Sequence, residues 1–273
     1  MSTLDVAKKD FLDVRRAKIV WFVGALYVLF MLLLIYAGQT GSQDPNILYS
    51  LWNLTAVGAM FIPLIALVTA YLAIAGERES GGIKYLLSIP NARRDVVLGK
   101  FITRTGVVSA SIVVAFLVSA VLTLLWYPET RIDVLGGMMA LTVLYALTYV
   151  AVAIGISAAT ASRSRAMGGS IAFFFVTSVL NVLGPLQLVI DYVANDLAGL
   201  EISTNQIAFV QSLVSPTAAY VNSTGLVFPD GFNTIPEELP WFLQGETMVV
   251  VMLGWLVVPL ALGIWQFERA DLG

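Results

Sequence analysis

The 273-residue sequence contains no cysteine and no histidine. Their absence excludes disulfide frameworks, thiol chemistry and the usual zinc sites, because all three depend on these side chains. Charge is scarce as well: Asp, Glu, Lys and Arg make up 12% of the residues, whereas a typical soluble domain carries about 25%. We expect no metal, no cofactor and no nucleic-acid partner.

Charged residues are absent from six long apolar stretches. These stretches are Ile19–Gln43, Pro45–Gly76, Thr105–Pro128, Val134–Ser162, Ala166–Ile190 and Thr247–Phe267. Each is longer than the roughly 20 residues that an α-helix needs to cross a hydrocarbon core of about 30 Å. A soluble core built from six such helices would have no polar faces to turn toward water. The sequence therefore predicts an all-α integral membrane protein with six transmembrane helices.

Two further absences narrow the function classes. The sequence has no G-x-x-x-x-G-K-[S/T] loop to cradle ATP phosphates, so energy from ATP would have to come from a partner. No ionisable residue interrupts the six stretches, whereas ion-coupled transporters usually carry an embedded charge. An ATP-independent secondary transporter stays open as an alternative, since backbone carbonyls can bind Na⁺, and so does a non-transporting membrane maturation factor. A membrane-embedded enzyme is disfavoured, because it would have few catalytic groups.

Positive charge is almost confined to one side of the predicted bundle. With six spans, residues 1–18, 77–104, 163–165 and 268–273 share a side and hold 14 of the 15 Lys and Arg residues; only Arg131 lies opposite. The positive-inside rule places this side in the cytoplasm. We therefore expect a multi-pass protein of the cell membrane with both termini cytoplasmic.

Residues 191–246 show the opposite charge pattern, with seven acids and no Lys or Arg. This extracytoplasmic segment has an uncharged middle, Ile202–Pro229, that is rich in Ser, Thr, Asn and Gln, which disfavours a seventh span. We predict a re-entrant or amphipathic element lying over the outer mouth of the bundle. A structured loop without a direct role is the alternative.

Residues 1–18 contain a helix candidate that begins at Leu4 and carries both signs of charge. Leu4, Phe11, Val14 and, less cleanly, Leu12 form its predicted apolar stripe. Such a helix lies preferentially in the membrane interface and would enter the first span as an elbow. The alternative is a solvated helix that only sets the topology.

The connector at residues 77–103 places eight charges between two uncharged stretches. Gly81-Gly82 breaks the second helix, since glycine adopts turn conformations at low steric cost. A short apolar helix is predicted at Ile83–Ser88, Pro90 stops it, and Asn91 would cap the helix that enters the third span. An apolar element flanked by charges and mounted between two spans is typical of a docking element. A loop that only packs on its own bundle is the alternative.

Several short motifs follow one another in this connector. They are Glu-Arg-Glu-x-Gly at Glu77–Gly81, Leu86-Leu87-Ser88, Pro90, Arg93 or Arg94, and Leu98-Gly99-Lys100. Together they resemble the signature of type-2 ABC transporter permeases, and the order of spans, elbow, connector and outer segment extends the resemblance to one permease domain over residues 1–273. Gly82 departs from the pattern, since the family often has Thr there. Within the family, the chain is similar to permeases linked to maturation of copper-containing nitrous oxide reductase and to archaeal relatives.

The resemblance implies a transmembrane subunit that pairs with a second permease copy, identical or different, and sits on two copies of a separate ATPase subunit. It implies that the connector is a coupling helix seated in a groove of the ATPase, and that the chain is not itself an enzyme. The residues expected to couple to the ATPase are Glu77, Glu79, Gly81, Gly82, Leu86, Leu87, Pro90, Arg93 and Arg94. Leu86 and Leu87 would supply buried contacts, and the charged residues a polar rim. Membrane lipid is the remaining expected partner.

Overall fold

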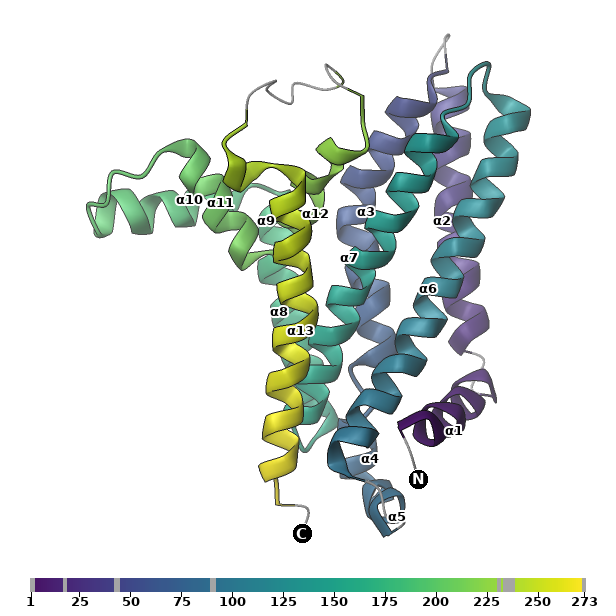
Figure 1. The fold of residues 1–273 in the computed structure, drawn as a ribbon, viewed down its shortest axis with the longest axis vertical. Helices are drawn as coiled ribbons and strands as arrows, with labels where there is room; N and C mark the ends of the chain where they lie inside the picture. The colour runs from purple at the N-terminus through teal and green to yellow at the C-terminus, as the bar shows by residue number, and fades with distance from the viewer. Residues whose placement is uncertain are drawn as a thin grey trace.

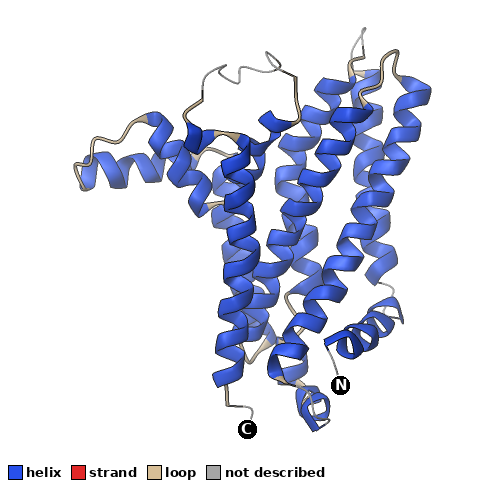
Figure 2. Ribbon diagram, viewed as in Figure 1, coloured by secondary structure: helices blue, strands red, loops and turns tan. Residues whose placement is uncertain are grey.

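The computed structural model describes residues 3–16, 19–41, 45–88, 92–229, 232 and 239–271. Within these residues the regular secondary structure is helical and no strand is present (Figure 2). Six of the described helices are long and apolar enough to cross a membrane. The predicted all-α fold with six spans is confirmed.

The six spans cross the bundle from one end to the other (Figure 1). They are α2 (Ile19–Thr40), α3 (Ile47–Ala70) continued by α4 (Ala75–Glu79), α6 (Arg93–Trp126), α7 (Ile132–Ala159), α8 (Arg163–Phe174) continued by the π-helix η1 (Phe175–Val179) and α9 (Leu180–Val182), and α13 (Gly245–Arg269). The remaining elements are α1 (Thr3–Arg16), α5 (Gly82–Ser88), α10 (Pro185–Asp191), η2 (Tyr192–Leu197), α11 (Thr204–Val214), α12 (Pro216–Ser223), η3 (Thr224–Leu226) and η4 (Trp241–Leu243).

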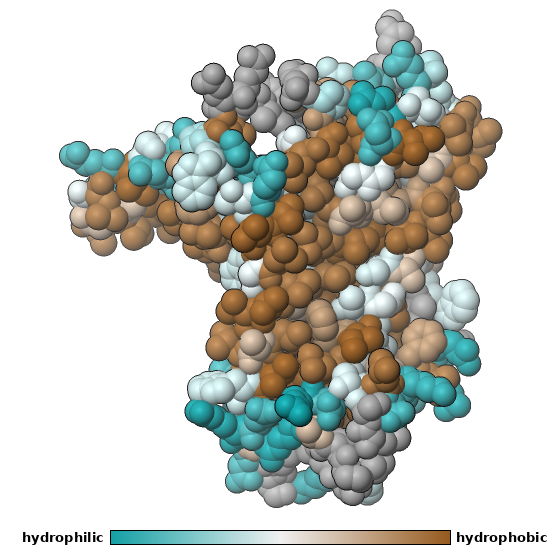
Figure 3. Space-filling model, in the orientation of Figure 1, coloured by the Kyte–Doolittle hydropathy of each residue, from teal (hydrophilic) through white to brown (hydrophobic). Residues whose placement is uncertain are grey.

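Helix α7 forms the centre of the bundle, where it packs against α3, α6 and α13. Its contact with α13 is close because both helices carry glycine there: a Cβ at Gly155 would collide with the carbonyl of Pro259. Small residues of this kind let membrane helices approach backbone to backbone. The surface of the bundle shows a broad apolar belt between two more polar ends (Figure 3), as a protein surrounded by lipid requires.

Both termini lie at one end of the bundle, together with α1, α4 and α5 (Figure 1). We call this the connector end. At the opposite end, α10, η2 and α11 project sideways from the bundle as an arm (Figure 1), so we call it the arm end.

The apolar stripe predicted for α1 is wrong in part. The buried residues of α1 are Val6, Ala7, Asp10 and Val14. Of the predicted stripe only Val14 is buried, whereas Leu4, Phe11 and Leu12 are exposed. The helix is rotated relative to the predicted stripe because Asp10 turns inward to pair with Lys100 of α6, at 3.0 Å between Oδ1 and Nζ.

The fifth span ends earlier than its uncharged stretch. The helix stops at Val182, since Gly184 adopts a left-handed conformation with φ of 92° and the chain turns away. Pro185 then begins α10, where its missing N–H is no loss. The continuing apolar sequence up to Ile190 forms the arm instead of the membrane-crossing helix.

Helix α12 lies inside the bundle, which fits the re-entrant form of the predicted element and not an amphipathic element that lies over the outer mouth. Thr217, Ala219 and Tyr220 are fully buried, and α12 packs against α3, α7 and α13. The segment is held there because its polar side chains find hydroxyl partners on the spans, as described below. Neither α11 nor α12 is long enough to cross a bilayer, so the described residues contain no seventh span.

Candidate functional site

The connector is built as two short helices separated by a left-handed glycine. Four turn residues, 71–74, end the regular helix of α3 before α4 begins. The backbone N–H groups freed at Ile74 and Ala75 both donate to the hydroxyl of Ser157 on α7, at 3.0 and 2.9 Å. Between α4 and α5, Gly81 has φ of 76°, a conformation that other L-residues rarely adopt. This explains why the predicted Gly81-Gly82 break falls where it does.

Helix α5 is amphipathic, with its apolar side turned toward the rest of the chain. Ile83 and Leu86 are 2% and 5% exposed and belong to the core, whereas Lys84 is exposed and Tyr85 is 80% exposed. Leu86 therefore lies in the protein's own core in this structure. The side chain of Leu87 and the whole of Pro90 and Asn91 lie outside the described residues; α6 begins at Arg93, and the Asp95 carboxylate accepts the N–H of Ala92 at 3.3 Å.

Glu77 belongs to a buried ionic cluster at the junction of α1, α4 and α6. Lys100 is 2% exposed and its Nζ donates to Glu77 Oε1 at 2.6 Å and to Asp10 Oδ1 at 3.0 Å. Arg104 Nη2 reaches the same Asp10 oxygen at 3.4 Å. A buried charge is tolerated only when it is paired in this way, so the cluster fixes α1 and α4 to the start of the third span.

Arg93 and Arg78 hold the ends of two other spans. Arg93 Nη1 donates to the carbonyl oxygens of Phe267, Glu268 and Ala270 at the end of α13, at 2.9, 3.0 and 2.5 Å. Arg78 Nη1 donates to the carbonyls of the last turn of α7, at 3.1 Å to Ala158 O and 3.0 Å to Thr160 O. Cations at helix C-termini satisfy the unbonded carbonyls and complement the helix dipole.

The same two arginines flank one aromatic ring. Phe267 is fully buried, and the guanidinium carbons of Arg78 and Arg93 lie 5.7 and 5.9 Å from its ring centre. This is the range of cation–π contacts. The Phe267 ring thus joins the last turn of α13 to both sides of the connector.

Glu79 makes the corresponding contact with a helix N-terminus. Its Oε2 accepts the backbone N–H of Arg163, the first residue of α8, at 2.6 Å, and its Oε1 lies 3.8 Å from the Arg163 guanidinium. An acid at this position satisfies one of the free N–H groups of the first turn. The connector therefore contacts the fifth span as well.

Two predicted coupling residues, Glu79 and Arg93, thus face the ends of the chain's own helices. Glu77, Glu79 and Arg93 contact three different elements, Gly81 and Gly82 form the turn, and Arg94 alone among the predicted charges is exposed without a described contact to another helix. The sequence pattern did not predict the roles of Arg78, Lys100 and Phe267. Lys100 left a usable signal, because it occupies the same helix face as the buried Val96, Val97 and Thr103.

A second polar cluster lies within the bundle and consists of hydroxyl groups. The Thr217 hydroxyl on α12 lies 2.9 Å from Tyr145 Oη, 2.7 Å from Tyr149 Oη and 3.0 Å from Ser178 Oγ. The Tyr145 hydroxyl also donates to the Ala59 carbonyl on α3 at 2.8 Å. Thr217 therefore joins α12 to the fourth and fifth spans, and Tyr145 extends the cluster to the second.

The π-helix η1 supplies the polar groups that the fifth span contributes to this cluster. Tyr149 Oη lies 2.9 Å from both Thr177 Oγ1 and Ser178 Oγ of η1, and the Ser215 hydroxyl donates to the Thr177 carbonyl at 2.5 Å. A single π-turn shifts the backbone register of a helix and often marks a functional position. Here it turns two adjacent hydroxyls and a carbonyl toward α12.

Comparison with known proteins assigns the chain to a family. Residues 4–272 match the family described as ABC-2 family transporter protein. A protein named probable ABC transporter permease protein NosY from Pseudomonas aeruginosa is 26% identical over 283 residues, which cover 98% of each chain. A protein of the same name from Stutzerimonas stutzeri is 23% identical over 277 residues, with 97% of each chain covered.

These matches agree with the resemblance seen in the sequence and extend over the six-span bundle and its connector. Membership of the family implies an ABC ATPase partner and pairing of permeases, and it indicates that this subunit is not itself the ATPase. The chain belongs to the ABC-2 family and is the multi-pass transmembrane permease subunit of an ABC transporter.

Proposed function

We propose that α4, α5 and the first turn of α6 form the joint through which a separate ATPase subunit moves the spans. The observation that carries the proposal is that four elements contact charged residues of this connector. Lys100 links α1 to Glu77, α7 contacts Arg78, α8 contacts Glu79 and α13 contacts Arg93. A rigid-body displacement of the connector would act on all four elements at once. Such motions are the usual way in which closure of one subunit is passed to another.

Within this joint we assign two roles. The exposed side of α5 with Lys84 and Tyr85, and Arg94 beside it, would face the ATPase. The inward-facing charges, Glu77, Glu79 and Arg93, would pass the movement to the helix ends. Gly81 and Gly82 would set the angle between α4 and α5, and the expectation for Leu87 and Pro90 remains contact with the ATPase.

We further propose that the connector end faces the cytoplasm of a cell membrane. It carries both termini (Figure 1) and nearly all of the Lys and Arg residues, which agrees with the positive-inside rule. Two permeases, identical or different, would then bind two ATPase subunits, one at each connector. Helix α1 would lie in the interface as an elbow, with the exposed Leu4, Phe11 and Leu12 in contact with lipid.

The proposal is tested by separating docking from transmission. With the permease and its ATPase purified together in lipid nanodiscs, Tyr85→Asp should reduce the amount of ATPase retained, because it adds a negative charge to the docking face. Arg93→Ala should leave retention unchanged and reduce the effect of the permease on ATP hydrolysis, since it releases α13 from the connector.

Matched variants serve as controls. Tyr192→Asp changes an equally aromatic, exposed residue at the arm end and should leave ATPase retention unchanged. Arg94→Ala removes the neighbouring exposed arginine and should affect retention more than transmission. The joint would be disproved if Tyr85→Asp and Arg93→Ala both kept full retention and coupling, and transport driven by an ion gradient without ATPase would contradict the family's mode of action altogether.

A further inference from the structure

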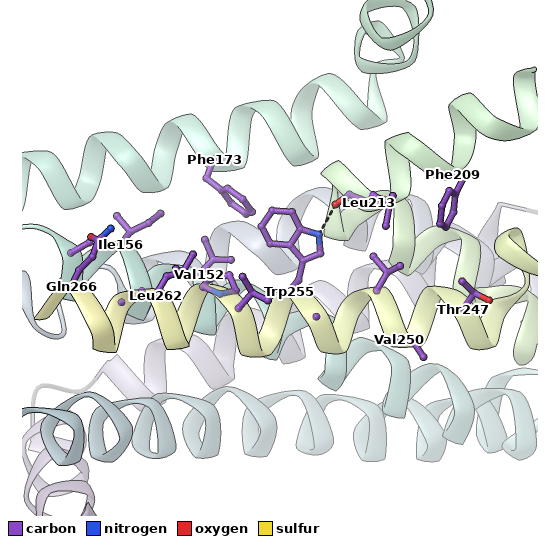
Figure 4. Close-up of a pocket in the computed structure, with 17 residues that line it drawn as sticks. Val152, Ile156, Phe173, Phe209, Leu213, Thr247, Val250, Trp255, Leu262 and Gln266 are labelled. Carbon is purple, nitrogen blue, oxygen red and sulfur yellow. Dashed lines mark hydrogen bonds between the residues drawn. The ribbon is translucent and has the colours of Figure 1, made fainter. Parts of the chain in front are cut away.

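A long apolar groove runs along α13 on the side that faces α8 and α11 (Figure 4). It has a volume of about 840 Å³ and extends from Thr247 near the arm end to Gln266 near the connector end. Between these two polar side chains the wall consists of apolar residues of α7, α8, α11 and α13, with Ile156, Phe173 and Leu213 among them. None of these residues belongs to the connector joint.

Several residues that line the groove are small. Gly155 and Gly263 bring α7 and α13 into backbone contact, and the exposed Ala159 and Gly254 add little or no side chain. A Cβ at Gly254 would meet no atom within 4 Å. The open space beside α13 is therefore built into the sequences of α7 and α13 and does not arise from one displaced side chain.

Trp255 crosses the groove near its middle. Its indole N–H donates to the Leu213 carbonyl on α11 at 3.0 Å, and its ring lies 5.3 Å from the ring of Phe173 on α8 (Figure 4). This single side chain links α13 to α11 and α8. Any molecule seated there would touch the indole ring.

The groove extends over most of the depth of the hydrocarbon core. Thr247 and Gln266 are separated by 19 residues of α13, or about 28 Å at 1.5 Å per residue, which is close to the hydrocarbon thickness of a bilayer.

The ends of the groove suit a phospholipid. Gln266 presents an amide at the connector end, where α8 starts with Arg163 and Arg165 and α13 ends with Arg269, all three exposed. Glu79 shares the charge of Arg163, and Glu268 lies next to Arg269 in the chain. Basic residues between membrane helices at this level attract lipid phosphate.

We propose that this groove is a binding site for membrane phospholipid, with acyl chains lying along α13 against Trp255 and the phosphate near the arginines of the connector end. The lipid completes the packing between the fifth and sixth spans, which protein side chains leave open. It is a structural ligand of the permease and is separate from the ATPase joint.

The test uses native mass spectrometry of the full-length protein extracted from phosphatidylglycerol–phosphatidylethanolamine vesicles. The unchanged protein should carry phospholipid adducts, and Gly254→Phe should lose them because the ring fills the groove. Gly106→Phe is the matched control, since Gly106 also lies exposed on a span and its Cβ would meet nothing within 4 Å. Ala159→Leu is a second blocking variant from another wall, in case Gly254→Phe does not fold.

A second measurement places the lipid at the indole. Phospholipid with brominated acyl chains should quench more fluorescence in the unchanged protein than in Trp255→Phe. Equal quenching in the two proteins, or adducts that persist in both blocking variants, would overturn the proposal. Loss of permease pairing in Gly254→Phe with unchanged lipid adducts would also overturn it and would assign the groove to a second protein chain.

Discussion

The connector end and the interior of the bundle are held together by different chemistry. At the connector end, four elements are joined by charged side chains: the Lys100 cluster, two arginines on helix carbonyls and Glu79 on a helix N-terminus. In the interior, hydroxyl groups join α12 to the fourth and fifth spans at Thr217, and Tyr145 extends the cluster to the second span. Each region uses the polar groups that its surroundings tolerate.

The physical reason lies in the solvation of the two regions. A charged side chain in the hydrocarbon costs several kcal/mol, so charges gather where the chain leaves the membrane. Hydroxyl groups cost less and can satisfy one another across helices. Charged contacts therefore join the helices at the connector end, while hydroxyl contacts hold α12 inside the bundle.

The largest effect is expected from the buried lysine. Lys100→Met keeps the length of the side chain but leaves Glu77 without its cation and Asp10 with only the longer Arg104 contact at 3.4 Å, and removing one partner of a buried ion pair typically costs about 3–5 kcal/mol. The thermal unfolding midpoint in detergent, or the yield of folded protein, should fall clearly. Arg131→Met is the control, because the Arg131–Asp133 pair at 2.7 Å is exposed at the arm end and should contribute little. Equal unfolding midpoints for the two variants would show that the buried Lys100 cluster contributes no more stability than the exposed Arg131–Asp133 pair.

A smaller effect is expected from the hydroxyl cluster. Thr217→Val preserves the shape of the residue and removes the oxygen shared by Tyr145, Tyr149 and Ser178. At about 0.6 kcal/mol for an average hydrogen bond between membrane helices and at most about 1.7, a loss of roughly 2 kcal/mol is expected. Thr123→Val is matched to it, since that buried hydroxyl donates only to Ser119 O of its own helix. If both variants unfolded at the same temperature, the cluster would not be what holds α12.

The smallest change in stability is expected in the connector turn, where substitutions at Gly81 and Gly82 should act in different directions. Gly81→Ala forces a Cβ into a left-handed conformation at a cost of about 1–2 kcal/mol, whereas Gly82→Ala lies in α5 and should be neutral or slightly stabilising. The two variants should therefore differ in coupling between ATP hydrolysis and the permease, measured as for Arg93→Ala. A Gly82→Ala variant as defective as Gly81→Ala would show that the angle between α4 and α5 is not set by the backbone of Gly81.

The spans, their number and the position of the connector could be predicted from the sequence. Uncharged stretches long enough to cross a bilayer are a property of composition along the chain, and Gly81-Gly82 marks a break by its own backbone freedom. The errors lie where the pattern was ambiguous. The stripe of α1 included Leu4 and Phe11 because charges were assumed to point outward, yet Asp10 is buried against Lys100.

The fifth span and the segment after it show the same limit. The uncharged stretch predicts one span up to Ile190, but Gly184 ends the membrane-crossing helix. Helix α12 then returns into the bundle. Thr217 and Tyr220 gave no signal of burial, since hydroxyl residues suit a loop equally well. Their place depends on Tyr145 and Tyr149, more than 60 residues earlier in the chain.

By itself the sequence determined that this protein spans a membrane, how many times it does so, and that a charged connector lies between the second and third spans. Those features follow from hydrophobicity and glycine, which act locally along the chain. Only the tertiary structure decided that Arg78, Glu79, Arg93 and Lys100 each contact a different helix, and that a groove remains open beside Trp255. Charges and hydroxyls take their partners from whichever helices are neighbours in space, and that neighbourhood arises only when the spans have packed.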